Sequence, residues 1–93
     1  MIVERKIGQN RGTSRLWLEG KSLLANGWNN GDRFNAIFTP FGVVYQKDEE
    51  GSRKVAGTPD RPIIDTNTNK LLEFADIGDK VEIVFEPNTI TVR

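Results

Sequence analysis

The stretch GDRFNAIFTPFGVVYQ (Gly31 to Gln46) returns as GDKVEIVFEPNTITVR (Gly78 to Arg93), at a constant offset of 47 residues (78 − 31). Gly, Asp, Phe and Pro are identical at four equivalent positions, and apolar residues are kept at several others. In both stretches apolar and polar residues alternate on either side of a turn that contains proline, which predicts a β-hairpin. The chain therefore contains one hairpin-forming unit twice.

The repeat extends upstream of the hairpin through three shorter matches. They pair Arg5–Ile7 with Arg53–Val55, Arg15–Glu19 with Arg61–Asp65, and Leu23–Leu24 with Leu71–Leu72. Each copy reads as two strands, a short helix and the hairpin, which is a ββαββ unit. We expect copies at residues 1–46 and 53–93, joined by the charged linker 47–52. Because neither copy is long enough to bury a core alone, residues 1–93 should form one domain.

Local signals refine the expected unit. Residues 21–26 predict a short helix, and Gly27 is placed to supply the left-handed residue that ends it. The proline of each hairpin stands at the second turn position, which suits a type I turn. Phe38 and Phe85 should be equivalent core positions, since they fall on the apolar face of their strands. We also expect Trp17 in the core.

The composition excludes several classes of protein. The chain has no cysteine and no histidine, so it lacks disulfides, thiolate-ligated zinc and the usual general base at neutral pH. No apolar run approaches the roughly 20 residues of a membrane helix, and the N-terminus lacks the apolar core of a signal peptide. We therefore expect a cytoplasmic protein that is not an enzyme, does not enter a membrane, and holds neither cofactor nor metal.

The net charge of zero conceals an asymmetry between the two halves. Residues 1–46 carry six basic and three acidic groups, whereas residues 47–93 carry seven basic and ten acidic groups. This split fits a molecule with one basic and one acidic face. It fits ordinary solvated surface equally well, so charge alone leaves both interpretations open.

The second hairpin, GDKVEIVFEPNTITVR, preceded by strand, loop, strand and helix, resembles the swapped-hairpin AbrB family. The segment LWLEGKSLLANGW (Leu16 to Trp28) is similar to the SymE branch of that superfamily. The resemblance covers both copies. It implies a mostly β fold with short helices, in which the two units interlock their hairpins into one AbrB-like barrel. With both units in one chain, the barrel should form intramolecularly as a monomeric pseudo-dimer.

The same resemblance implies binding of double-stranded DNA through basic residues on the first strand, loop and second strand of each unit. Those cations are Arg5, Lys6, Arg11 and Arg15 in the first copy, and Arg53, Lys54 and Arg61 in the second. The polar residues of the first loop suit phosphate or base contacts, but they are also ordinary turn residues. Trp17 and Trp28 could stack on bases, although burial in the core is the expectation for both.

A second resemblance is more particular. The combination of IGQNRGTSRLWLEGK, RPIID and GDKVEIVF is similar to the segment that precedes the catalytic domain in some bacterial and phage DNA cytosine-5 methyltransferases. It implies a transcription-regulator-like DNA-binding module, or the DNA-targeting N-terminal domain of such an enzyme, fused to a catalytic domain. The alternative is a protein-interaction module, an antitoxin or adaptor that docks a protein partner through its acidic second copy. Clustering of the seven cations on one face favours DNA, whereas dispersal together with an apolar or acidic patch favours a protein partner.

Overall fold

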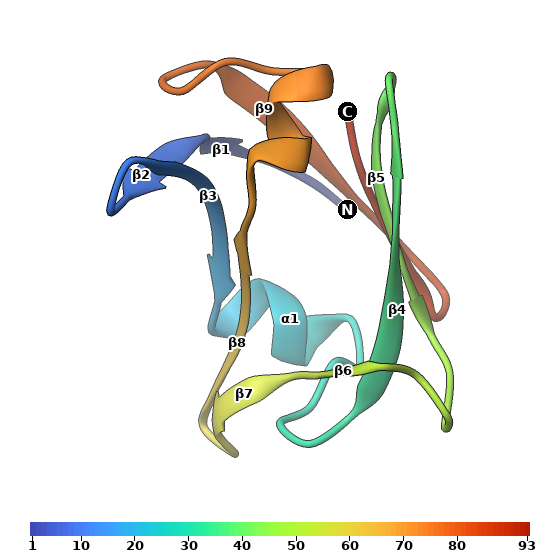
Figure 1. The fold of residues 1–93 in the computed structure, drawn as a ribbon. Coiled ribbons are helices and arrows are strands. Elements are labelled where there is room, and N and C mark those ends of the chain that lie inside the picture. The colour runs from blue at the N-terminus through green and yellow to red at the C-terminus, as the bar shows by residue number, and fades with distance from the viewer.

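A computed structural model describes residues 1–93 as ten strands, one short helix and one 3-10 helix (Figure 1). In chain order the strands are β1 (Ile2–Lys6), β2 (Gly8–Asn10), β3 (Thr13–Glu19), β4 (Arg33–Thr39), β5 (Gly42–Lys47), β6 (Arg53–Lys54), β7 (Ala56–Thr58), β8 (Arg61–Asn67), β9 (Lys80–Glu86) and β10 (Thr89–Val92). The helix α1 spans Lys21–Ala25, and the 3-10 helix η1 spans Asn69–Glu73. The mostly β class predicted from the sequence is confirmed.

The strands form two antiparallel sheets that lie on opposite sides of the core (Figure 1). Sheet A has the order β1-β9-β10-β5-β4-β6, and sheet B has the order β2-β3-β8-β7. Each strand has a counterpart five strands away in the chain, such as β6 for β1. When every strand is replaced by its counterpart, each sheet order is obtained again in the opposite direction. As a result β1 pairs with β9 of the second half, while β6 pairs with β4 of the first half.

The expected closed barrel is not formed. Sheet A ends at β1 and β6, sheet B ends at β2 and β7, and no strand pairing joins these edges. The chain passes from one sheet to the other at Ile7, and again at Val55, within a single buried residue. The strands that follow these crossings, β2 and β7, have only three residues each, so they are too short to continue the pairing around a barrel.

The two crossing residues are held by the repeated Gly-Asp pairs. The N–H of Ile7 donates to the carbonyl of Asp79 at 2.9 Å, and the N–H of Gly78 donates to the carbonyl of Ile7 at 2.7 Å. In the same way Val55 donates to Asp32 and accepts from Gly31, both at 2.8 Å. Each Gly-Asp pair therefore satisfies the backbone of a buried residue that comes from the other half of the chain.

The core lies between the sheets and is closed at its ends by α1 and η1 (Figure 1). Phe34 links two other aromatic rings edge-to-face, with centroids 5.8 Å from Trp28 and 5.6 Å from Tyr45. The buried Tyr45 hydroxyl of sheet A lies 2.5 Å from the Thr66 hydroxyl of sheet B. This hydrogen bond joins the two sheets inside the mostly apolar core.

Two expectations about burial were wrong. Trp17 is 37% exposed, because β3 turns Leu16 and Leu18 toward the core and alternation points the residue between them outward. Phe85 is buried as expected, but Phe38 is only partly buried. Two cations, those of Arg53 and Lys70, lie 5.8 Å and 5.3 Å from the centroid of its ring. Trp28 is fully buried, as predicted.

The predictions made for the turns are confirmed in part. Gly27 has φ 80° directly after the helix, so the predicted left-handed terminator is confirmed. Asn88, which follows the proline of the second hairpin, has φ 60°. A type I turn requires a negative φ at that position, so the type I assignment was wrong for this hairpin. Asparagine adopts a positive φ more readily than most residues, because its short polar side chain can bond locally.

Candidate binding surface

The seven cations that the AbrB resemblance implicates do not gather on one face. Arg15 and Arg61 lie on β3 and β8 of sheet B, and Arg11 occupies the exposed turn between β2 and β3. Lys6 and Lys54 are exposed at the two opposite edges of sheet A. The structure therefore disperses these charges over both sheets.

The remaining two of the seven point away from Lys6 and Lys54. Arg53 lies opposite the buried Phe34, and its guanidinium is 5.8 Å from the centroid of the Phe38 ring. Arg5 donates to the backbone carbonyl of its neighbour Glu4 at 2.7 Å. Since successive residues of a strand point to opposite faces, neither arginine shares the outer face of sheet A with the lysine that follows it.

On sheet B two arginines are already engaged by carboxylates. Arg15 makes a two-pronged contact with Asp65, with both N–O distances 2.9 Å, and its guanidinium lies 4.3 Å from the centre of the Trp17 ring. Arg61 donates to Glu19 at 2.8 Å. That hydrogen bond lowers the pKa of Glu19, against a smaller effect of desolvation in the opposite direction. These pairs make the exposed face of sheet B nearly neutral.

Two other basic residues, which the sequence reasoning missed, complete like-charged pairs on sheet A. Lys80 lies directly opposite Lys6, and Arg33 lies directly opposite Lys54. All four are exposed, and none belongs to an ion pair. Like charges opposite each other on antiparallel strands destabilise a sheet, so their retention in both halves calls for another reason. The sequence offers one signal for these residues, the basic residue that follows each Gly-Asp. Their pairing with a basic residue of the other half cannot be seen in the sequence.

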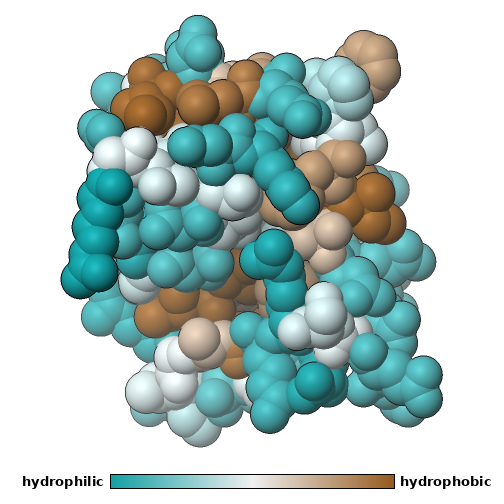
Figure 2. Space-filling model, viewed as in Figure 1, coloured by the Kyte–Doolittle hydropathy of each residue, from teal (hydrophilic) through white to brown (hydrophobic).

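The outer face of sheet A carries a row of four apolar residues and one threonine between these charged corners, which we call the apolar row. The strand registers align Ile2 with Val84, Val84 with Thr91, Thr91 with Val44, and Val44 with Ile37. The end residues Ile2 and Ile37 are 54% and 49% exposed, and the three between them are partly exposed. Figure 2 shows apolar surface on the side of the molecule that β4 and β5 form. No element of the chain covers this face.

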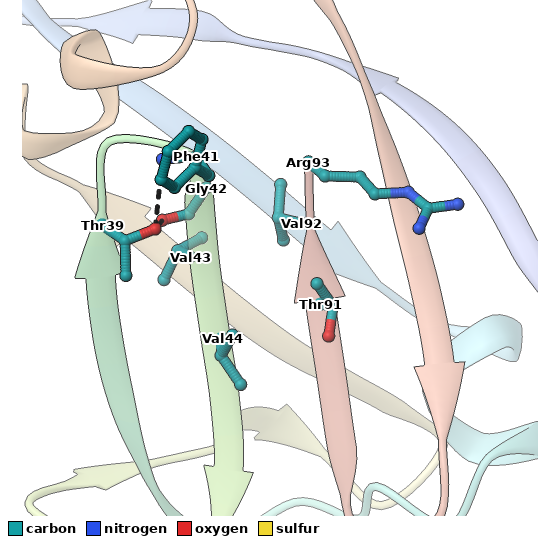
Figure 3. A pocket seen from close by; sticks show the side chains of 8 residues that line it. All are labelled: Thr39, Phe41, Gly42, Val43, Val44, Thr91, Val92 and Arg93. Atoms are coloured by element: carbon teal, nitrogen blue, oxygen red, sulfur yellow. Dashed lines mark hydrogen bonds between the residues drawn. The ribbon is translucent and has the colours of Figure 1, made fainter.

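A shallow cavity of about 280 Å³ adjoins the row (Figure 3). Its lining residues are Thr39, Phe41, Gly42, Val43, Val44, Thr91, Val92 and Arg93. The hollow lies where Gly42 has no side chain between Thr39 on β4 and Arg93 beyond β10. At its rim Phe41 is 87% exposed, the most exposed large apolar residue of the chain. An exposed aromatic ring beside an apolar hollow is typical of a binding surface.

No group of three or more carboxylates is placed to hold a metal ion. No helix has the length and apolar character needed to cross a bilayer.

The geometry thus describes a mostly β chain of two sheets, in which one sheet face carries the apolar row, glutamates beside the row at its β1–β9 end, and basic pairs at two corners. Comparison with protein-family models, with curated proteins and with solved structures finds no match.

Proposed function

We propose that this chain is a protein-interaction module, built as an AbrB-like pseudo-dimer in which two ββαββ units interlock within one chain. The symmetric strand order supports the interlocked arrangement, because the first strand of each unit completes the hairpin of the other unit. The reciprocal bonds of the two Gly-Asp pairs support it too. The module acts by docking a partner and performs no chemistry itself.

The observation that carries this proposal is the uncovered apolar row on sheet A. Single exposed apolar residues are common on protein surfaces, but four apolar residues and a threonine aligned across five strands, with Phe41 and a hollow beside them, are not. The dispersal of the seven cations and the neutralisation of Arg15 and Arg61 point the same way. The docking surface is therefore the face of sheet A, in place of the acidic second half that the charge count suggested.

Affinity capture tests the proposal. Wild-type chain, Ile37→Lys and the matched control Leu72→Lys are immobilised and exposed to lysate from the native host. Leu72 is 43% exposed on η1, close to the exposure of Ile37, but it lies away from the row. A partner retained by the wild type and by Leu72→Lys, and lost from Ile37→Lys, supports docking on sheet A. Equal capture by all three chains contradicts it.

A second candidate function, DNA binding, is favoured by the two like-charged pairs, Lys6 with Lys80 and Arg33 with Lys54. Arg and Lys that face water without acidic partners suit DNA phosphates. In this function the chain is a transcription-regulator-like module or the DNA-targeting domain of a cytosine-5 methyltransferase. If the four cations each neutralise one phosphate, the log–log dependence of affinity on salt has a slope of about −3.6.

Titration of labelled duplex DNA at several salt concentrations distinguishes the two functions. For DNA binding, Lys6→Ala and Lys80→Ala each reduce the magnitude of the slope by about one. Arg15→Ala is the control, because Arg15 is held by Asp65 and should change the slope little. Absence of binding at low salt removes the DNA candidate.

A further inference from the structure

The apolar row of sheet A reads the same in both directions. From β1 to β4 its residues are Ile2, Val84, Thr91, Val44 and Ile37. Two copies can be stacked with these faces together and related by a two-fold axis that is parallel to the strands and passes through Thr91. In this arrangement each side chain of the row in one copy lies on a side chain of the same type in the other copy. We infer that the partner of this face is a second copy of the chain, stacked sheet to sheet with Ile2 against Ile37. This inference rests on the proposed interaction function and names its partner.

The charges that flank the row select this orientation. Glu4 and Glu82 lie on one side of the row, and Glu86 lies on the other, all toward the β1–β9 end of the sheet. An axis along the row would place Glu82 of one chain over Glu86 of the other, which brings like charges together. The axis parallel to the strands avoids this clash.

With that axis, the positions that face the three carboxylates carry no charge. They are Thr39 opposite Glu4, Gly42 opposite Glu82, and Gln46 opposite Glu86. The hollow at Gly42 leaves room for the Glu82 side chain. Arg93 follows Thr91 on the same face of β10, so it lies on the axis and faces the Arg93 of the second copy. Each Arg93 contacts Glu82 of its own chain at 3.1 Å, and this pairing offsets the charge of the two facing cations.

The contact expected from this stacking is small. Five strands about 4.8 Å apart, each contributing about five residues of 3.3 Å, present on the order of 400 Å² of projected surface. That is about 800 Å² for the two partners together, below the roughly 1,200 Å² of stable complexes, so the dimer should be weak, reversible and dependent on concentration. A row of isoleucine, valine and threonine whose flanking glutamates face uncharged positions suits such a self-association.

Sedimentation equilibrium over a wide range of concentration tests the inference. We expect the wild type and Leu72→Lys to show monomer–dimer equilibrium, and Ile37→Lys to remain monomeric while keeping the circular dichroism of the wild type. A lysine at Ile37 places a charge between the stacked faces, against Ile2 of the second copy, whereas position 72 is outside them. A monomeric wild type at all concentrations overturns the inference.

Disulfide trapping tests the pairing of Ile2 with Ile37 without relying on a disruptive variant. The chain has no cysteine, so Ile2→Cys and Ile37→Cys each introduce a single thiol. Within one chain the two positions are four strands apart, on the order of 20 Å, too far for a disulfide. Mixing the two single variants should give rapid cross-linking, much faster than either variant alone. Equal rates in the mixture and in the separate variants overturn the inference.

The outcomes separate this inference from the function on which it rests. A monomeric chain that still captures a host protein through Ile37 keeps the interaction function and removes the second copy as partner. A monomeric chain that binds duplex DNA through Lys6 and Lys80, and captures nothing through Ile37, removes both.

Discussion

Gly42, at the start of β5, lies so close to Val92 on β10 that a β-carbon at Gly42 would overlap the Val92 carbonyl oxygen. Its φ of 151° is also a value that residues with a side chain rarely adopt. These two strands form the centre of sheet A, where the two halves of the chain meet. Glycine at position 42 therefore sets the approach of the halves and leaves the hollow on the outer face.

We predict that Gly42→Ala destabilises the fold by about 3 kcal/mol or more, because steric overlap with backbone adds to the strain of its φ. The control is Gly12→Ala, where φ is also positive at 79° but a β-carbon meets nothing within 4 Å. That change should cost only about 1–2 kcal/mol. Urea denaturation of both variants measures the free energies of unfolding. Equal losses would show that β5 can move away from β10 without penalty.

The carboxylates of the two Gly-Asp pairs should act as equivalent caps. Asp32 accepts the N–H of Asn29 at 2.8 Å, and Asp79 accepts the N–H of Asp76 at 2.9 Å. Replacing either aspartate by alanine should cost about 1 kcal/mol, as loss of a comparable helix cap does. Asp32→Ala should cost slightly more, since Asp32 also pairs with Lys47 at 3.3 Å.

Asparagine variants provide the control for these caps, because an amide oxygen still accepts the backbone N–H. Thermal unfolding should rank each asparagine variant between the wild type and the corresponding alanine variant. If Asp79→Ala were as stable as the wild type, the Gly-Asp pair would matter only through its glycine and its backbone.

Much of the fold followed from the repeat, since the alternation around residues 81–85 and the glycine after α1 each have a local cause. Trp17 was misplaced because an apolar triplet in a strand cannot bury all three residues when one face is solvated. The barrel was expected from a family resemblance. Its absence depends on how sharply the chain bends at Ile7 and Val55, which no local pattern encodes.

The candidate surface was harder to predict than the fold. Arg15 and Asp65 are 50 residues apart in the chain, so the neutralisation of Arg15 depends on the β3–β8 register. The apolar row collects one residue from each of five strands, and none of these stands out in its own strand. Register between distant strands is therefore the missing information, and it is set by packing over the whole sheet.

Tyr45 should give the stability of the fold a distinct dependence on pH. Burial raises the pKa of its hydroxyl to about 12, only partly offset by the hydrogen bond to Thr66. In the unfolded chain the pKa is about 10, so above that pH unfolding releases a proton that the folded state keeps. This contribution to stability is complete below pH 10 and is lost as pH rises toward 12.

The free energy of unfolding should therefore fall by up to about 1.4 kcal/mol per pH unit in this window on account of Tyr45. Tyr45→Phe should lack that component, while the contributions of lysines that titrate in the same range remain. Tyr45 is the only tyrosine of the chain, so the ultraviolet absorbance of tyrosinate reports its ionisation without ambiguity. Ionisation near pH 10 in the folded protein would show that its hydroxyl is solvated.

The two halves should be unable to fold separately. In the intact chain, β1 of the first half bonds to β9 of the second, and β6 of the second bonds to β4 of the first. Residues 1–46 alone lose the partner of β1, one of the two partners of β3 and the bonds that hold Ile7. A fragment of this length also falls near the lower limit for an independent core. We therefore expect the isolated fragment to be unfolded, or to fold only as a homodimer that replaces the missing half by a second copy.

Mixing residues 1–46 with residues 47–93 should restore a folded complex with the circular dichroism of the intact chain, because every strand then regains its partner. Sedimentation analysis of each fragment and of the mixture measures this. The homodimer of residues 1–46 and the mixed complex can be told apart by isotope labelling of one fragment. A stable, monomeric and cooperatively folded first half would contradict the interlocked arrangement, since its β1 would then need no strand from the second half.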